Sequence, residues 1–586
     1  MFGLKRASQQ GTAGKNYKWI ALSNTTIAAF MTALDGSCVM IALPAIFRGI
    51  NLNPLAAESS AYLLWILTGY TLVMAVLVVT LGRIGDMFGR VRIYNLGFVI
   101  FSIGSILLSF TWSTGGTGAM ELIIFRMIQA LGGACLFANS AAILTDAFPV
   151  NQRGLALGIN QIAFIAGGFI GIIAGGLLAE VGWRWVFRVS IPVAVAGTIW
   201  AYIQLREIGI HKAARIDWAG NLTFAVGLTM LLIGVTYGIQ PHGVSSMSWT
   251  TPFVLSMLLG GVAVLGLFAF VEQRVKDPMF QLSLFRIRAF TAGNIASLLS
   301  SIARGGLGFM MSIWLQGIWL PLHGYGFEIT PLWAGICMLP QSAGFLVMGP
   351  ISGHLSDRFG ARMFATGGMI LAAVGFALLL VLPVNFVYWQ FALVLVLLGV
   401  ATGLFGSPNN AAIMNSVPAE HRGVGSGMRS AFLNAGSPLS NGAFFTLMTI
   451  GLSATLPQAM YGGLIQNGVS SSVATGLTKL PPFGYLSAAL MGYNPIGTLL
   501  GPSTLSSLPA DTARRLTSRS YFPQLISASF HHALGMVLMF CVVISLVAAA
   551  ASWVRGKRFV YTEKQVERAA TETVTGASDQ FPQPGR

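Results

Sequence analysis

The sequence predicts an all-α membrane protein in which two parallel six-helix bundles flank a central two-helix insertion, giving fourteen transmembrane helices. Its 586 residues are 54% hydrophobic and only 9% charged, with a mean hydropathy of +0.72, whereas a soluble domain carries about 25% charged residues. Apolar runs of roughly 20 residues recur along the chain, which is the length that a bilayer core requires of a helix. These runs are too long for the strands of an outer-membrane barrel.

An internal repeat divides the spans into two halves. The polar stretch 82–92 returns 271 positions later as 353–362, with the pattern Gly-x-x-x-Asp-x-x-Gly in both copies. Arg153 likewise recurs 269 positions later as Arg422. Repeated apolar segments are a known construction of secondary transporters. Because the two extra spans between the halves are an even number, the halves keep the same orientation in the membrane.

The apolar runs place the spans and the segments between them. We expect spans at residues 19–46, 61–81, 92–112, 120–145, 155–180, 186–205, 218–238, 252–271, 289–320, 330–352, 363–384, 390–415, 424–452 and 527–554. The corresponding domains are a cytoplasmic arm (1–18), an N-terminal six-helix bundle (19–206), the central insertion with its loops (207–288), a C-terminal six-helix bundle (289–555) that includes a long outer loop (453–524), and a disordered cytoplasmic tail (556–586).

The charge distribution predicts the orientation of the chain. The net charge is +16, and most of the 34 Lys and Arg residues fall on the side of the membrane that would hold both termini. This bias indicates that both termini are cytoplasmic. The basic character is therefore explained by topology, and we expect no nucleic-acid partner.

Enzymatic, metal and redox functions have little support in the sequence. The four cysteines lie in separate spans without nearby histidines, which is typical of small core residues rather than of a disulfide or metal site. No catalytic triad stands out, and no Gly-Lys-Ser phosphate-binding loop is present, so ATP is not the expected energy source. We expect neither an enzyme nor a bound cofactor or metal.

Several motifs resemble those of the major facilitator superfamily, and in particular its fourteen-helix drug:proton antiporter branch. The stretch 82–92 is similar to the loop between helices two and three of that family, 34–44 to the first-helix motif, 126–134 to the proton-coupling motif of helix four, and 183–187 to the turn between helices five and six. The resemblance covers roughly residues 17–555. It implies that the hinge-type loops form a conformational gate, for which the matching residues are Gly82, Asp86, Gly89, Arg90, Arg153, Asp357, Arg358 and Arg422.

The helix-five motif departs from the family at one position. Its glycines are present as Gly167, Gly171, Gly175 and Gly176, and such small residues let helices approach closely. Ile172 stands where the family has a proline, so the source of the expected helix kink is missing. This departure keeps proton-linked import open beside export.

Asp35 is the acidic residue that lies well inside a predicted span. A carboxylate at that depth is costly unless it is paired, and such residues are usually functional. Burial favours the protonated form, so Asp35 is a candidate proton carrier; the alternative is a structural aspartate bonded to its neighbours. Arg126 is the natural partner by charge and by resemblance. From the predicted helix ends the two lie at different depths, so a direct ion pair would require helix tilt or a bridging water, and Arg126 could instead bond backbone carbonyls or Glu121.

Polar and aromatic residues in the spans are candidates for a substrate cavity. Arg304 could meet an anionic group of the substrate, or could simply reach a lipid headgroup or a carbonyl. The remaining candidates could equally serve as interhelical hydrogen-bonding or interfacial residues. They are Gln129, Asn139, Gln161, Trp314, Gln316, Asn409 and Asn410.

These features together predict a proton-coupled exporter of lipophilic, possibly cationic, drugs or natural products that works by alternating access. We expect a monomer in the plasma membrane of a bacterium or archaeon, with a small-molecule substrate, protons and lipid as its partners. The alternatives are a proton-linked importer and a non-transporting scaffold or sensor that uses the long outer loop.

Overall fold

The described part of the chain is helical, without a β-strand, in this computed structural model. The structure describes residues 16–556 except 54–58, 150–151, 209–216, 239–246, 276–277, 279, 419–421, 478–481 and 491–493. Fourteen of its helical segments are long and apolar enough to cross a membrane. The expected arm and tail therefore lie almost wholly outside the described residues.

The first half contains six spans. They are formed by α1 (Tyr17–Gly49), α2 (Ser59–Phe88), α3 (Arg90–Ser109), α4 (Gly115–Ala147), α5 (Arg153–Val181), and the short α6 (Trp185–Arg188) followed directly by α7 (Ser190–Gln204). The insertion consists of α8 (Trp218–Gly238) and α9 (Pro252–Glu272).

The second half begins after the 3₁₀ turn η3 (Leu282–Arg286). Its first span is broken into α10 (Arg288–Arg304), α11 (Leu307–Trp314), the π-helical turn η4 (Leu315–Trp319) and α12 (Leu320–Leu322). The other spans are α13 (Thr330–Phe359), α14 (Ala361–Val381), α15 (Tyr388–Asn415), α16 (Arg422–Gln466) and α21 (Tyr521–Val554). The predicted fold class is confirmed.

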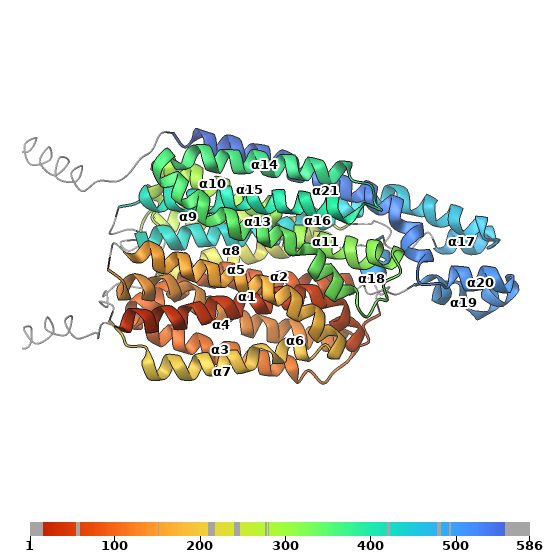
Figure 1. Cartoon of the computed structure of the whole chain (residues 1–586), viewed down its shortest axis with the longest axis horizontal. Helices are drawn as coiled ribbons and strands as arrows, with labels where there is room; N and C mark the ends of the chain where they lie inside the picture. Colours follow the sequence, from red (N-terminus) through yellow and green to blue (C-terminus); the bar gives the residue numbers. More distant parts are fainter. Residues whose placement is uncertain are drawn as a thin grey trace, which may run out of the picture.

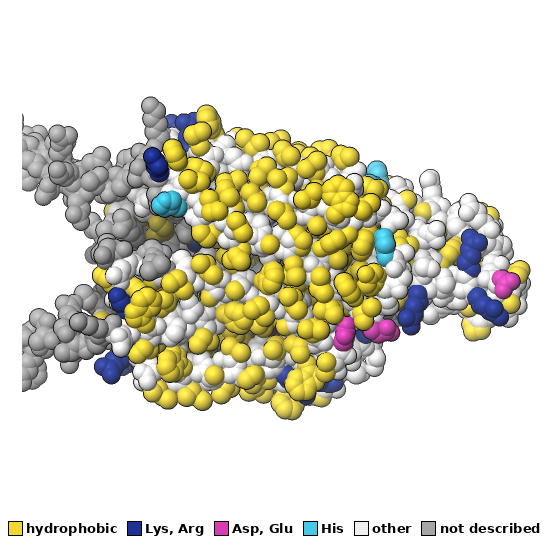
Figure 2. Space-filling view, in the orientation of Figure 1, with side chains coloured by type: hydrophobic (Ala, Val, Ile, Leu, Met, Phe, Trp, Pro, Cys, Tyr) yellow, Lys and Arg dark blue, Asp and Glu magenta, His cyan; other side chains and the backbone are white. Residues whose placement is uncertain are grey.

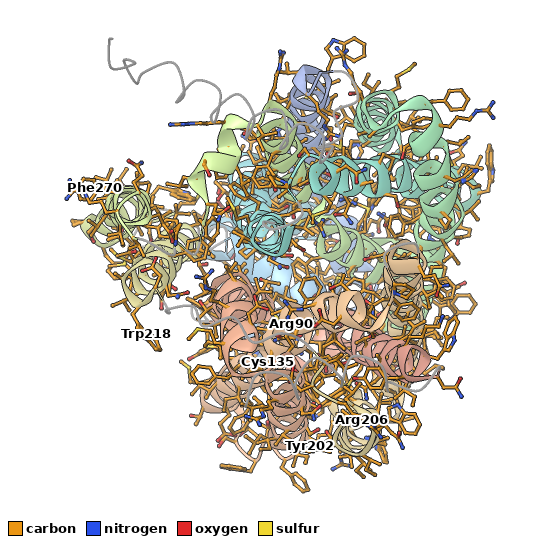
Figure 3. The ribbon with its side chains drawn as sticks, turned by 90° about the vertical axis from the view of Figure 1, so that its left-hand side faces the viewer. Arg90, Cys135, Tyr202, Arg206, Trp218 and Phe270 are labelled. Carbon is orange, nitrogen blue, oxygen red and sulfur yellow. The ribbon has the colours of Figure 1, made fainter. Side chains whose placement is uncertain are left out.

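The helices run nearly parallel to the long axis of the molecule (Figure 1). We call the end where α1 begins and α21 ends the terminal side, and the opposite end the far side. On the face shown in Figure 2, hydrophobic side chains form a broad belt across the middle, while charged side chains gather toward the two ends. From the terminal side, the two halves lie one above the other, and Trp218 and Phe270 mark the α8–α9 pair on one flank (Figure 3).

The two halves meet along two seams, α5 against α13 and α2 against α16. On the first seam, a Cβ at Gly176 would lie 2.4 Å from the Leu332 Cα, and a Cβ at Gly335 would lie 2.8 Å from the Ile172 side chain. Ile172, which replaces the family's proline, therefore packs at the contact between the halves, and α5 continues unbroken through it.

The insertion covers the second seam. Both α2 and α16 contact α8, and the Thr80 hydroxyl donates a hydrogen bond to the Asn221 side-chain oxygen. Phe224, Phe268 and Phe280 form an aromatic cluster whose ring centroids lie 5.3–5.4 Å apart. The α8–α9 pair is thus packed on the bundle rather than free in the membrane.

The repeat predicted from sequence is visible in the backbone of the hinge-type loops. Gly89 has φ +112° and directly precedes α3, and Gly360 has φ +90° and directly precedes α14. Side chains rarely adopt these left-handed conformations. Both turns therefore require glycine, and they lie 271 residues apart.

The expected long loop at 453–524 is largely helical. α16 continues to Gln466, well past the predicted end of its span, and is followed by α17 (Ser471–Leu477), α18 (Pro482–Leu490), α19 (Ile496–Ser507) and α20 (Ala510–Leu516). Most of this segment projects from the far side (Figure 1). α18 instead packs inward, where it contacts α2 of the first half and η4 and α11 of the second.

Gly171 tests whether the close packing of α1 and α5 stabilises the fold. A Cβ at this position would lie 2.5 Å from the Leu34 carbonyl oxygen, so Gly171→Ala should lower stability by about 1–3 kcal/mol and lower the Tm in detergent. Gly158→Ala is the matched control on the same helix, because no atom lies within 4 Å of its added methyl group. Equal melting temperatures for the two variants would contradict this packing.

Candidate functional site

A hydrogen-bonded cluster surrounds Asp35 in the core of the first half. Arg126 Nη1 lies 2.5 Å from Asp35 Oδ2, and Gln129 Nε2 donates to Asp35 Oδ1 over 2.9 Å. Arg126 Nη1 also donates to Gln129 Oε1 over 2.7 Å. The Ser190 hydroxyl donates to Asp35 Oδ1 at 3.3 Å, and Gln129 Nε2 reaches the Ser105 hydroxyl at 2.9 Å. α1, α3, α4 and α7 therefore all contribute to one polar cluster.

The cluster is closed to solvent and carries no net charge. Asp35 and Gln129 are fully buried, and Arg126 is 4% exposed. The guanidinium lies over the Tyr70 ring, 4.5 Å from its centroid, and its Nε has no hydrogen-bond partner. The Tyr70 ring offsets part of the cost of this missing hydrogen bond, because an aromatic face attracts a cation most strongly where water is excluded.

Small residues position this cluster. A Cβ at Gly104 would lie 2.7 Å from the Gln129 Cα, so the glycine lets α3 approach α4 beside Gln129. On the other side of α1, Gly171 and Gly175 of α5 pack against the backbone of Leu34 and Cys38. The helix-five glycines thus fix α1 on both sides of the aspartate.

The direct ion pair corrects the expectation that tilt or a water would be required. α1 continues to Gly49 and α4 begins at Gly115, so both helices extend further toward the far side than predicted. Counted from these ends, the Cα atoms of Asp35 and Arg126 lie about 21 Å and about 17 Å deep by helical rise. An arginine side chain spans the remaining difference. Glu121 accepts from the Ser113 hydroxyl instead.

The first hinge forms an ionic network within its own half. Arg90 lies 2.7 Å from a carboxylate oxygen of Asp86 and 2.7 Å from one of Asp146. Glu207 accepts hydrogen bonds from the backbone N–H groups of Arg90 and Val91 at 3.1 and 3.0 Å. The gate residues Asp86 and Arg90 therefore pair with each other, and Arg90 holds Asp146 as a second carboxylate partner. In Figure 3 Arg90 lies near the centre of the terminal side.

The second hinge has different partners. Position 361, which corresponds to Arg90, is an alanine, and Arg362 stacks over Trp553 with its guanidinium carbon 3.7 Å from the ring centroid. Arg358 is exposed and lies over Phe359. Gly82 and Gly85 of the first hinge pack on α4 at Ala138 and Asn139. The side chains of Arg153, Asp357 and Arg422 lie outside the described residues.

The structure does not bring the eight predicted cavity residues onto one surface. Gln129 belongs to the Asp35 cluster, and Asn139 bonds the Cys135 carbonyl on its own helix. Trp314 is fully buried against Phe386 and Phe391, with centroids 5.0 and 5.8 Å away. Gln316 bonds the Ser312 hydroxyl and the Ile41 carbonyl. These four residues form internal contacts.

The other four predicted cavity residues differ in their exposure to solvent. Asn409 is buried and bonds the Ser297 hydroxyl at 2.7 Å, and its side-chain oxygen accepts from Arg555, which follows the end of α21. Burial lowers the pKa of the Arg555 guanidinium to about 10. Gln161 and Asn410 are exposed, and Arg304 is partly exposed. Only these last three could meet a ligand in this state.

Sequence reasoning did not identify Tyr70, Ser105 and Ser190 around Asp35, or Asp146 and Glu207 at the hinge. The two acids did carry a signal, because each lies at the end of a span where it can meet the basic hinge. The other three are ordinary residues of apolar helices, and their positions depend on how neighbouring helices are rotated. Among the described residues no cluster of three metal-ligating side chains occurs, and the four cysteines are free and buried.

Two repeated six-helix bundles, a buried ion pair in mid-span and fourteen spans define a secondary transporter. The Major Facilitator Superfamily model matches residues 25–217 and 213–441. The chain belongs to this superfamily, which confirms the resemblance seen in the motifs.

Curated relatives cover most of the chain. It is 29% identical over 434 residues to the riboflavin transporter RibZ of Clostridioides difficile, covering 73% of this chain and 88% of the relative. It is 30% identical to the multidrug resistance protein Stp of Mycobacterium tuberculosis over 75% of this chain and 77% of that one. A tetracenomycin C resistance and export protein of Streptomyces glaucescens is 25% identical over 94% and 93%.

Solved structures share the fold at lower identity. A bacterial homologue of the human lysosomal transporter Spinster, in an inward-facing state, superposes with a TM-score of 0.56 at 17% identity, covering 94% of this chain and all of that one. A D-xylose–proton symporter gives a TM-score of 0.52 at 15% identity over 81% and 97%. These similarities show the architecture alone.

A double-mutant cycle tests the ion pair in the Asp35 cluster. Arg126→Gln leaves a buried carboxylate without its counter-ion and should destabilise the protein by roughly 3–5 kcal/mol. Adding Asp35→Asn removes that charge, so the double variant should melt at a higher temperature than Arg126→Gln alone. The measurement is the Tm of purified protein in detergent. Strictly additive effects would show that the two charges do not interact.

Proposed function

We propose that this protein is a proton-coupled exporter of lipophilic drugs or natural products, and that Asp35 carries the proton. The observation that carries the proposal is the Asp35–Arg126 ion pair, buried in the middle of a span. Such a pair is neutral overall when Asp35 is ionised and leaves an uncompensated cation when Asp35 is protonated. Proton binding would therefore change the energy of the site by a large amount.

The neighbouring contacts give this change a route to the rest of the molecule. Protonated Asp35 would release Arg126, which keeps Gln129 Oε1 and the Tyr70 ring as partners. Asp35 lies on α1, which packs closely on α5, and α5 in turn meets α13 of the other half. A shift of α1 would therefore act on the seam between the halves.

Contacts on the two sides of the membrane support alternating access. Toward the far side the halves touch, because the Gln316 side chain donates to the Ile41 carbonyl at 3.3 Å and a Cβ at Gly308 would lie 3.2 Å from the Met40 sulfur. Toward the terminal side, Gln161 lies on the same face of α5 as Ile172 but is exposed. This pattern fits a state closed on the far side, with the α5 flank exposed toward the terminal side while α2 and α16 stay in contact there.

The charge bias of the sequence and the bacterial relatives support placing the protein in an inner membrane with both termini in the cytoplasm. The terminal side would then be the cytoplasmic side. The printed names of relatives support drug export: a multidrug resistance protein, a tetracenomycin C export protein and a methyl viologen resistance protein. Protons, lipid and a small molecule would be the partners of a monomer.

Import is the second candidate. One relative is named as a riboflavin transporter, and Ile172 replaces the proline that the antiporter motif contains. Substrate counterflow in oriented vesicles gives the direction of transport. A scaffold or sensor that acts through α17–α20 would lose its role on deletion of these helices without any change in transport.

Asp35→Asn tests the proton coupling. In proteoliposomes with an imposed pH gradient, the variant should fail to drive efflux of rhodamine B, because asparagine cannot exchange a proton, while substrate exchange without a gradient should persist. Asp511→Asn is the control, since that carboxylate is 99% exposed outside the spans. Gradient-driven efflux at the native rate in Asp35→Asn would rule out this residue as the proton carrier.

A disulfide between η4 and α18 tests whether α18 must move on the far side during transport. A Cβ at Gly317 would lie 3.4 Å from the Ala489 Cβ, close to the separation found in disulfides. Oxidation of a Gly317→Cys/Ala489→Cys protein should stop transport, and dithiothreitol should restore it. The two single variants are the controls, and full transport by the cross-linked protein would show that α18 does not move away from η4.

A further inference from the structure

Arg304 lies in the helical turn of the second half that corresponds to the Asp35 turn of the first. The two repeat offsets, 269 and 271 residues, relate position 35 to Arg304 and to Gly306 of that turn. The helix contacts agree within a residue or two: a Cβ at Gly167 would lie 2.2 Å from the Phe30 carbonyl, and a Cβ at Gly436, 269 positions later, would lie 2.5 Å from the Ser301 Cβ. α10 thus packs on α16 as α1 packs on α5.

The two equivalent turns differ in the sign of their buried charge and in whether a counter-ion neutralises it. Asp35 has a full counter-ion, whereas Arg304 donates only to neutral groups, with its Nε 3.3 Å from the Ser300 hydroxyl and its Nη1 3.1 Å from the Thr402 hydroxyl. The only acid in the span helices of the second half is Asp357, near the terminal end of α13 and far from mid-span. Arg304 is therefore a cation in mid-membrane without a carboxylate partner among the described residues.

The register of α1 and α10–α11 places Arg304 opposite the Asp35 turn. Both segments run from the terminal side to the far side, and they touch at Met40 and Gly308. One turn nearer the terminal side on each lie Gly36 and Arg304. No atom lies within 4 Å of a Cβ added at Gly36, so α1 leaves open space at the level of the arginine.

A similar opening continues along α15. One turn from Thr402 toward the terminal side, Gly406 also has no atom within 4 Å of an added Cβ, and one turn further Asn410 is exposed. Arg304 itself is partly exposed although it lies at the middle of its span. A ligand could therefore reach the guanidinium from the terminal side.

A second arginine adds to the positive charge of this region. The Ser301 hydroxyl donates to the Leu433 carbonyl over 2.8 Å, which sets α16 beside α10. Arg429 lies one turn before Leu433, toward the terminal side, and its buried Nε has no hydrogen-bond partner. The second half thus contributes two uncompensated cations between its mid-span and the terminal side.

We propose that Arg304 recognises an anionic oxygen, a carboxylate or phenolate, on the transported compound. The substrate class is then an amphipathic acid or zwitterion rather than a permanent cation. A guanidinium binds such oxygens through two parallel N–H donors, and a substrate anion would supply the counter-charge that the second half lacks. This inference rests on the proposed export function, because it assigns the substrate of the same site.

The test compares rhodamine B, whose carboxylate is free, with its ethyl ester, which lacks that charge. Binding of each dye to the purified full chain in detergent is measured by fluorescence polarisation. The native protein should bind the acid at least tenfold more tightly than the ester, because a hydrogen bond to a charged group is worth that factor or more. Arg304→Gln should abolish the preference by weakening binding of the acid alone, and Arg304→Lys should retain part of it.

Arg519→Gln is the matched control, since that arginine is 70% exposed on the far-side segment. Equal affinities for acid and ester in the native protein would overturn the inference. If Arg304→Gln weakened binding of the acid and the ester equally, the inference would also be overturned. Arg304 would then only hold α10 against α15 through Thr402. Efflux of rhodamine B under a pH gradient is measured in parallel: its absence in the native protein would overturn the proposed function, whereas its presence alongside equal affinities for acid and ester would overturn the role of Arg304 alone.

Discussion

The cost of a charge in a hydrocarbon environment governs this molecule. Asp35 and Arg126 are tolerated in mid-span because each is the counter-ion of the other. Gln129 and Ser190 donate further hydrogen bonds to the carboxylate, and the Tyr70 ring lies against the guanidinium. The surrounding helices meet at glycines, so the cluster is held by backbone contacts that leave little room for adjustment. Under the proposed mechanism, a change of one charge at this point would act through these contacts on α5 and on the seam with the other half.

The two halves use one architecture for different chemistry. In each half, the helix that follows the hinge (α3 or α14) begins directly after a glycine with positive φ. In each half, the first span (α1 or α10) also packs closely against glycines of the fifth span (α5 or α16). The first half compensates its buried charge internally, and its hinge arginine binds two carboxylates. The second half has alanine in place of that arginine, and the only acid in its span helices is Asp357, near the terminal end of α13. The fold is thus repeated while the buried charges differ: in mid-span the first half holds an ion pair, and the second holds an arginine without a carboxylate partner among the described residues.

Much of this arrangement was predictable from sequence, because the membrane restricts both hydropathy and charge so strongly. The spans, the repeat and the position of Asp35 inside a span followed from that restriction. The direct contact between Asp35 and Arg126 could not be predicted, because it depends on where α1 ends and α4 begins. Both helices extend beyond the apolar runs from which the spans were predicted. The partners Ser105, Ser190 and Tyr70 depend on helix rotation, which glycine contacts set. The helices α17–α20 carry short, weakly patterned sequences, so that segment resembled a loop.

The length of α16 has a consequence beyond the membrane. Its 45 residues correspond to roughly 67 Å of helix, about twice the thickness of a bilayer core. The part beyond the lipid is continuous with a span that lines the seam between the halves, and it leads into α17 and the projecting helices. Under the proposed alternating access, α16 would work as a lever arm: a small tilt of the second half within the lipid would become a larger displacement of α17 at its tip. With the proposed orientation, each such tilt would move the projecting helices on the outer side of the membrane.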